Sequence, residues 1–279
     1  MLKHGPGYKF VKIMVWLSWP IIMAGKKYSS LPGLKRIINP FFRRPYNEVT
    51  SIPIQASLTF PDSVPLPRRV IERILAGVDE KFIMRECICR GHNRVKSPPP
   101  DIGCIVLGPA VRRIHPSNGS MATTEQAIAH VRRAAETGLI ANIAHVWIDP
   151  LAYWTSFNNL LFICLCDDTN CLYRTYMKRR GQNLDGAYKK LEGIHIAVDH
   201  SLCSGCGLCA DKCFINAIEI KDGFAHIGDC CKGCGRCADL CPEKAVSITL
   251  DNEETLYRQV ISRINEMCSL KITNQGLRR

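Results

Sequence analysis

The chain has 279 residues, enough for two domains, and it contains sixteen cysteines. Its formal net charge of +12 would suit a nucleic-acid-binding protein if the charge were spread over a surface. Residues 1–47, however, carry nine Lys or Arg and no acidic residue, so the basicity belongs to the N-terminus and no nucleic-acid partner is expected. The sequence also lacks the G-x-G-x-x-G fingerprint of dinucleotide-binding folds and the Walker phosphate-binding loop.

The N-terminal segment, residues 1–47, contains an apolar run from Ile13 to Gly25 with two tryptophans inside it. This run is too short to cross a bilayer as a helix, for which about 20 residues are needed, and Pro20 would kink such a helix. Apolar residues between lysines are typical of a segment that lies on an anionic membrane surface. Packing against the rest of the protein and a signal peptide are the two alternatives. A second short cluster of the same kind consists of Ile37-Ile38, Phe41-Phe42 and Arg43-Arg44.

Residues 48–193 are expected to form a Cys-rich, mainly helical domain. One helix is predicted from about Arg68 to Ala76, after a proline-punctuated extended segment. A second helix is predicted to begin after Thr123, because Gln126 three residues later completes a capping box, and to end before Gly138.

Six cysteines flank the second helix, three on each side, and each trio contains a C-x-C pair. In extended backbone, residues i and i+2 face the same way, so each pair can present two thiolates to one metal centre. The helix would then act as a spacer that brings the two pairs together. The candidate ligands are Cys87, Cys89, Cys104, Cys164, Cys166 and Cys171.

Three interpretations of these six thiols remain open at this level. They hold an iron–sulfur cluster, they bind zinc, or they are buried or redox-active free thiols. The cluster is favoured, with the two C-x-C pairs as the first choice of ligands and Cys104 or Cys171 as replacements. Arg90, His92 and Arg94 follow the first pair, and a solvated face is the favoured interpretation of these three residues over a role in stabilising an anion.

The most specific motif is a doubled four-cysteine run within residues 203–241. Each copy has the spacing C-x2-C-x2-C-x3-C, and the copies are offset by 28 residues, so the segment is an internal repeat. In proteins with this spacing, three thiolates of a run bind one [4Fe–4S] cube and the fourth binds the other cube. Structural zinc is disfavoured, because isolated C-x2-C pairs would be enough for it. The prediction assigns Cys203, Cys206, Cys209 and Cys241 to cube one, and Cys231, Cys234, Cys237 and Cys213 to cube two.

On these runs, residues 194–250 resemble the bacterial-type two-[4Fe–4S] ferredoxins. The chain departs from that family at Phe214, where the family usually places proline after the fourth cysteine, whereas Pro242 keeps the pattern. This departure leaves the ligands intact and predicts unequal potentials for the two cubes. The other six cysteines are loosely similar to a Cys-rich domain that is fused to ferredoxin units in anaerobes.

Residues 251–279 are predicted to form a C-terminal helix, capped by Asn252 and ending near Cys268, followed by a basic tail. The fold class is therefore expected to be α+β, with a mainly helical Cys-rich domain and a ferredoxin-like two-[4Fe–4S] domain.

The resemblance implies low-potential electron transfer through two [4Fe–4S] clusters to a redox protein partner, with a third iron–sulfur cluster or zinc in the Cys-rich domain. One alternative is a reductase whose Cys-rich domain holds a substrate-binding cluster. Another is an activation or assembly factor that delivers electrons to a different metalloenzyme. Thiolate-bound clusters indicate a reducing, anaerobic cytoplasm, with the N-terminal segment on the cytoplasmic face of a membrane.

Overall fold

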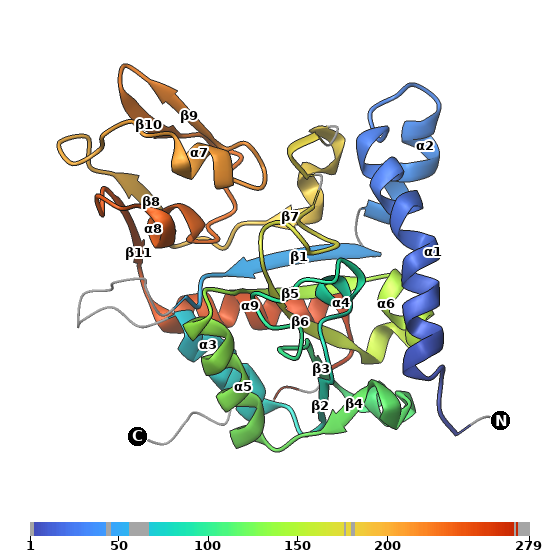
Figure 1. The fold of residues 1–279 in the computed structure, drawn as a ribbon. Coiled ribbons are helices and arrows are strands. Elements are labelled where there is room, and N and C mark those ends of the chain that lie inside the picture. Colours follow the sequence, from blue (N-terminus) through green and yellow to red (C-terminus); the bar gives the residue numbers. More distant parts are fainter. Residues whose placement is uncertain are drawn as a thin grey trace.

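The computed structural model describes residues 3–42, 46–55, 67–175, 177–179, 182–270 and 272 (Figure 1). Arg43 and Arg44 of the second N-terminal cluster and the tail 273–279 lie outside these residues. The α-helices are α1 (Tyr8–Lys27), α2 (Leu34–Ile38), α3 (Pro67–Gly77), α4 (Ile88–His92), α5 (Thr124–Glu136), α6 (Ile148–Tyr153), α7 (Leu208–Lys212), α8 (Arg236–Leu240) and α9 (Glu253–Met267). Short 3-10 helices are η1 (Asn39–Phe42), η2 (Pro109–Arg113), η3 (Pro116–Asn118), η4 (Phe157–Asn159), η5 (Met177–Arg179) and η6 (Gln182–Ala187).

A seven-stranded mixed sheet forms the centre of the molecule, in the order β4-β2-β3-β6-β5-β1-β7. Neighbouring strands are antiparallel except for β1 and β7, which run parallel. These strands are β1 (Asn47–Ile52), β2 (Lys81–Met84), β3 (Ile105–Leu107), β4 (Gly119–Met121), β5 (Ile140–Val146), β6 (Leu161–Cys166) and β7 (Tyr188–Lys189).

The expectation of a mainly helical Cys-rich domain is therefore wrong. Two long central strands, β5 and β6, are buried at every position. Strands that are covered on both faces carry continuous apolar runs without the alternation that marks a half-exposed strand. The sequence pattern consequently could not distinguish them from buried helical segments.

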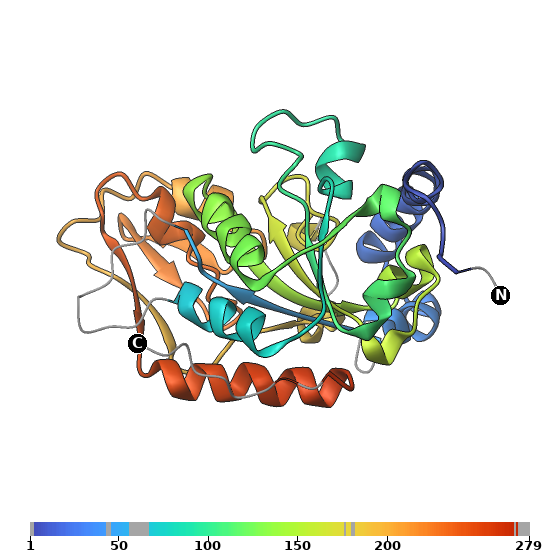
Figure 2. The ribbon, with the colours of Figure 1, turned by 90° about the horizontal axis from the view of Figure 1, so that it is seen from below.

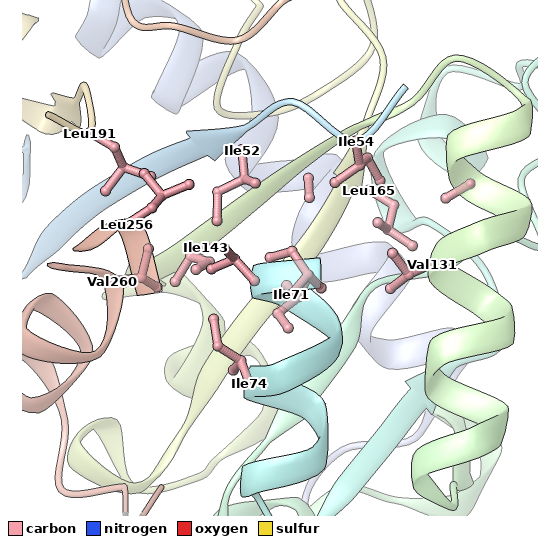
Figure 3. Packing of buried hydrophobic residues seen from close by; sticks show 14 of the residues in the cluster. Ile52, Ile54, Ile71, Ile74, Val131, Ile143, Leu165, Leu191, Leu256 and Val260 are labelled. Carbon is pink, nitrogen blue, oxygen red and sulfur yellow. The ribbon is translucent and has the colours of Figure 1, made fainter. Parts of the chain in front are cut away.

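The sheet separates two hydrophobic clusters. On one face, α3, α5 and α9 contribute Ile71, Val131 and Val260, which pack against Ile143 and Leu165 of the sheet (Figure 3). On the other face, α1 and α6 cover a second cluster that contains most of the six cysteines of the Cys-rich region. The sheet thus places the candidate thiols and α1 on the same side.

The three helices predicted from their sequence signals are confirmed. The first, α3, spans Pro67–Gly77. Thr123 and Gln126 form the predicted reciprocal capping box at the start of α5. The side chain of Asn252 accepts hydrogen bonds from the backbone of the first turn of α9, which ends at Met267.

The internal repeat appears in the backbone of residues 194–250. Strands β8 (Ile194–Val198) and β11 (Val246–Leu250) pair antiparallel, and β9 (Ile218–Lys221) and β10 (Phe224–Ile227) form a hairpin. Gly207 and Gly235, 28 residues apart, have φ of 77° and 76°, a left-handed conformation that glycine adopts without strain. This ferredoxin-like unit and α1 lie at opposite ends of the molecule in both views (Figures 1 and 2).

The apolar N-terminal run forms the long helix α1, which continues through Pro20. Its inner face buries Val11, Val15 and Met23, and it contacts α4 and α6. Among the described residues, no helix combines the length and apolarity that crossing a bilayer requires.

Candidate metal centres

The four cysteines assigned to cube one line a single pocket of about 340 Å³. Cys203, Cys206 and Cys209 come from one loop, and Cys241 arrives from the second copy of the repeat. The loop is tight: a side chain on Gly205, whose φ is +65°, would meet the carbonyl oxygen of Gly223 at 2.3 Å. Glycine is therefore required for the loop to close around this pocket.

The four cysteines assigned to cube two also lie close together, since the charge of Cys234 acts on the thiols of Cys213, Cys231 and Cys237. Burial raises the pKa of Cys213, Cys231 and Cys237. Backbone N–H groups donate to two of the sulfurs, from Ala217 to Cys213 at 3.2 Å and from Gly233 to Cys231 at 3.4 Å. Such N–H···S contacts stabilise the negative charge of thiolates and of a reduced cluster.

The six cysteines of the Cys-rich region also converge, and we call them the six-thiol site. The register of β3 and β6 pairs Ile105 with Ile163, so Cys104, just before β3, lies opposite Cys164. Cys164 and Cys166 are on β6 as expected for a C-x-C pair in extended backbone. The expectation is wrong for the other pair, because Cys87 caps α4 and Cys89 lies within that helix.

The sulfurs form a chain of contacts made of two trios. The neighbouring thiols of Cys104 and Cys89 lower the pKa of Cys87. On β6 and the loop after it, the thiols of Cys164 and Cys171 lower the pKa of Cys166 in the same way, and the Cys171 and Cys166 sulfurs are 3.0 Å apart. A thiol interaction between Cys104 and Cys164 links the trios. Among the described residues, no three His, Cys, Asp or Glu side chains are placed so that together they could hold a metal ion.

Three buried cations surround the six-thiol site. The ammonium of Lys26, on the inner face of α1, donates to the carbonyls of Leu172, Tyr173 and Thr175 in the loop after Cys171. Burial lowers its pKa to about 8, against the nearby sulfurs of Cys171 and Cys89, which act to raise it. Among the described residues, Lys26 has no carboxylate within ion-pair distance.

Arg90 is the second cation, and its side chain is 1% exposed. It donates to the carbonyl of Leu165, the residue before Cys166, and to that of Ile102, two residues before Cys104. It also lies 3.9 Å from Asp167. The interpretation of residue 90 as part of a solvated face is therefore wrong. The guanidinium ties the C-terminal end of β6 to the loop before β3 and so holds the two trios in register.

Arg174 is the third cation and connects the six-thiol site to the cube-two cysteines. Its backbone N–H donates to the carbonyl of Cys171 at 3.1 Å, while its guanidinium lies 3.7 Å from the Cys234 sulfur. The same guanidinium pairs with Asp168 at 2.7 Å and stacks on the Phe214 ring at 3.9 Å. Burial alone would lower the pKa of Arg174, but Cys234 and Asp168 outweigh it and raise the pKa.

These contacts explain the unusual residue of the first cysteine run. Phe214, in place of the usual proline, is 4% exposed and packs between Arg174 and Tyr188. Phe214 thus packs the ferredoxin-like unit against the hydrophobic cluster on the central sheet. Neither Lys26 nor Arg174 carried a signal in the sequence, because their roles depend on segments that are far apart in the chain.

Residues 196–219 match the family model of the 4Fe-4S binding domain. No curated protein and no solved structure matches the chain. The match covers the first cysteine run and the start of the hairpin that follows it. The chain therefore contains a ferredoxin-like 4Fe-4S binding domain, which gives it an iron–sulfur electron-transfer role.

Proposed function

We propose that the protein relays low-potential electrons through two [4Fe–4S] clusters, held by the cube-one and cube-two cysteines, into a third metal–sulfur centre at the six-thiol site. The 4Fe-4S binding domain supports the electron-transfer role. The repeated backbone geometry supports a second cluster, because the loops around Gly207 and Gly235 have the same conformation. A reducing cytoplasm is the compartment in which such thiolate-bound centres persist.

One observation carries the order of the three centres: the guanidinium of Arg174 contacts the Cys234 sulfur, and its backbone N–H donates to the carbonyl of Cys171. Cube two is then the cluster next to the six-thiol site. Cube one lies on the outer side, where Cys206 is exposed and where Leu202 and Leu208 present apolar surface to solvent. Such a surface suits transient docking of a redox protein. Electrons would enter at cube one, pass to cube two and reach the six-thiol site.

The buried cations support a negatively charged centre at the six-thiol site. Burying Lys26, Arg90 and Arg174 is costly unless negative charge compensates for it. Only Arg90 and Arg174 have carboxylate partners among the described residues. Deprotonated thiols would supply the missing charge, and crowded thiolates in turn need metal ions. An anionic iron–sulfur cluster meets both requirements, with zinc as the alternative to be tested.

The test is the metal and acid-labile sulfide content of the full chain, purified anaerobically. The expected result is about eight irons from the two cubes and about four more from the six-thiol site. Cys234→Ala should remove or convert one cube, and Cys166→Ala should remove only the additional iron. Cys230→Ala is the matched control, because this thiol belongs to neither run, and it should change nothing.

Other metal contents would overturn parts of the proposal. Zinc in the six-thiol site would make it a structural centre and end the relay at cube two. Zinc in the two runs would contradict the electron-transfer role itself. About eight irons, no zinc and six titratable thiols in residues 83–171 would remove the third centre.

A reductase is the second candidate, and a pocket favours it. An open pocket is lined by Arg174, Lys178, Lys212 and Phe214 and also by the carboxylates of Asp168 and Asp211. Phe214 directly follows the cube-two cysteine Cys213 in the chain, so a small polar substrate bound there would lie close to cube two. Catalysis at a cluster needs an iron with an open coordination position, whereas a relay does not. Cyanide or carbon monoxide should therefore perturb the electron paramagnetic resonance spectrum of a reductase and leave that of a relay unchanged.

A further inference from the structure

The outer face of α1 is an exposed apolar stripe. Phe10, Ile13, Trp16, Leu17 and Ile21 recur at helical spacing, and each side chain is between 47% and 72% exposed. A surface helix of a soluble protein normally turns a polar face to water. The inner face of α1 is apolar as well, so this helix is covered on one side by the protein and lacks a partner, among the described residues, on the other.

The stripe continues onto neighbouring elements and forms a surface that we call the N-terminal apolar face. At one end, the ring of Phe10 lies 6.1 Å from that of Trp154, which follows α6 and is half exposed. Leu151 of α6 is also exposed. Beyond the other end of α1, further exposed apolar residues follow in the chain, and we include them in this face: Leu31, Leu34, Ile37 and Phe41. Most of the exposed large hydrophobic side chains among the described residues belong to this face, and such concentration marks an interaction site.

The charge around this face indicates what covers it. Residues 1–47 contain nine basic residues and no acid. Lys9 and Lys27 stand exposed near the two ends of α1, and Lys35 and Arg36 are exposed on α2. A second copy of the chain would bring these like charges together, which disfavours a symmetric dimer through this face. Tryptophans and apolar side chains bordered by lysines match the interface of an anionic bilayer.

We propose that the N-terminal apolar face docks on an anionic phospholipid surface, with α1 lying in the plane of the membrane. Apolar side chains of α1 and Trp154 insert at the level of the headgroups, and the basic residues attract the lipid phosphates. No described helix could cross the membrane instead. The docking itself does not depend on the proposed relay.

The docking also orients the molecule. Lys26, on the inner face of α1, binds the loop after Cys171, so the six-thiol site lies directly behind the docking helix. The ferredoxin-like unit lies at the far end (Figures 1 and 2). Cube one would then face the solvent, and the six-thiol site would face the membrane. This orientation of the metal centres rests on the proposed function.

The experiment is flotation of the full chain, purified anaerobically, with two kinds of vesicle. One is phosphatidylcholine alone, and the other contains about one third phosphatidylglycerol to supply the negative charge. The protein should float with the anionic vesicles, and raising the salt concentration should weaken binding several-fold, since ions screen exposed charges. Leu17→Asp should reduce binding at least tenfold. Met121→Asp is the matched control, because Met121 on β4 is about as exposed as Leu17, and this variant should bind as the natural protein does.

Two charge-reversal variants test the attraction of the basic residues to anionic lipid. Lys27→Glu should weaken binding to anionic vesicles, whereas Lys221→Glu in the distant ferredoxin-like unit should not. Iron content and circular dichroism of each variant verify that it folds, and they separate a failure of docking from a failure of the relay. Equal flotation with neutral vesicles would refute the anionic preference. Failure to float with either kind of vesicle would overturn the membrane assignment. If the protein were then a dimer that Leu17→Asp disrupts, the face would bind a second copy of the chain.

Discussion

Replacing Arg174 by methionine tests the contact on which the proposed relay depends. Methionine keeps much of the length and apolar volume of the arginine side chain but removes its charge and its hydrogen bonds. Asp168 would not be left alone, because Arg236 also pairs with it at 2.6 Å. The variant should therefore fold, with a loss of stability below the roughly 3–5 kcal/mol expected when a buried charge loses its sole partner.

The larger effect should be on the potential of cube two. A unit charge at 3.7 Å from a charged sulfur contributes about 4.5 kcal/mol at an effective dielectric constant of about 20. The added electron is spread over a cube that extends beyond Cys234, so about one third of this value is a reasonable expectation. About 1.5 kcal/mol corresponds to a shift of about 65 mV for one electron. The shift should be toward more negative potential, because the lost cation stabilised the reduced cluster.

A redox titration followed by electron paramagnetic resonance measures this shift. Lys212→Met is the matched control: it also removes one positive charge beside a cube-two ligand, but Lys212 is 45% exposed and screened by water. The control should move the potential by less than about 20 mV. An Arg174→Met protein with full iron content and an unchanged or more positive potential would refute the assigned position of cube two.

Three further outcomes follow from the structure. Gly205→Ala should lose iron from cube one. Gly207→Ala should retain it, because there is open space at the Cβ position, with a loss of stability of about 1–2 kcal/mol from the left-handed backbone. Equal iron loss in the two variants would contradict the steric argument. Burial raises the pKa of Asp149 to about 7, so stability should fall as pH rises from about 4 to 7. Asp149→Asn should remove the part of this trend that falls between pH 5 and pH 8, about 2–3 kcal/mol, visible as a smaller drop in melting temperature over that range. Thr123→Ala should destabilise the protein by about 1 kcal/mol in thermal unfolding, and a neutral result would show that the capping box contributes nothing.

Local signals determined several features without any tertiary information. The doubled cysteine run, its offset of 28 residues and its glycines predicted a repeated unit, and the backbone repeats accordingly. Helices α5 and α9 followed from their capping residues, Thr123 and Asn252. Each of these features depends on residues within a few positions of one another, so the sequence pattern contains the whole interaction.

The central sheet was not predictable in this way. Strands β5 and β6 are buried on both faces, and the hydrophobic effect then selects apolar residues at every position. Their pairing with β1 and β3 brings together segments separated by many residues. Only the folded chain decides such partners, because loop closure and packing set the register.

The six-thiol site likewise combines features that the local sequence reveals with features that only the folded chain determines. The sequence identified all six cysteines, but the pairing of β3 with β6 and the side chain of Arg90 bring the two trios together. Lys26 and Arg174 reach the site from α1 and from the loop after Cys171, and nothing in their local sequence distinguishes them from solvated cations. A buried charge is recognised by what surrounds it in space, and spacing along the chain does not contain that information.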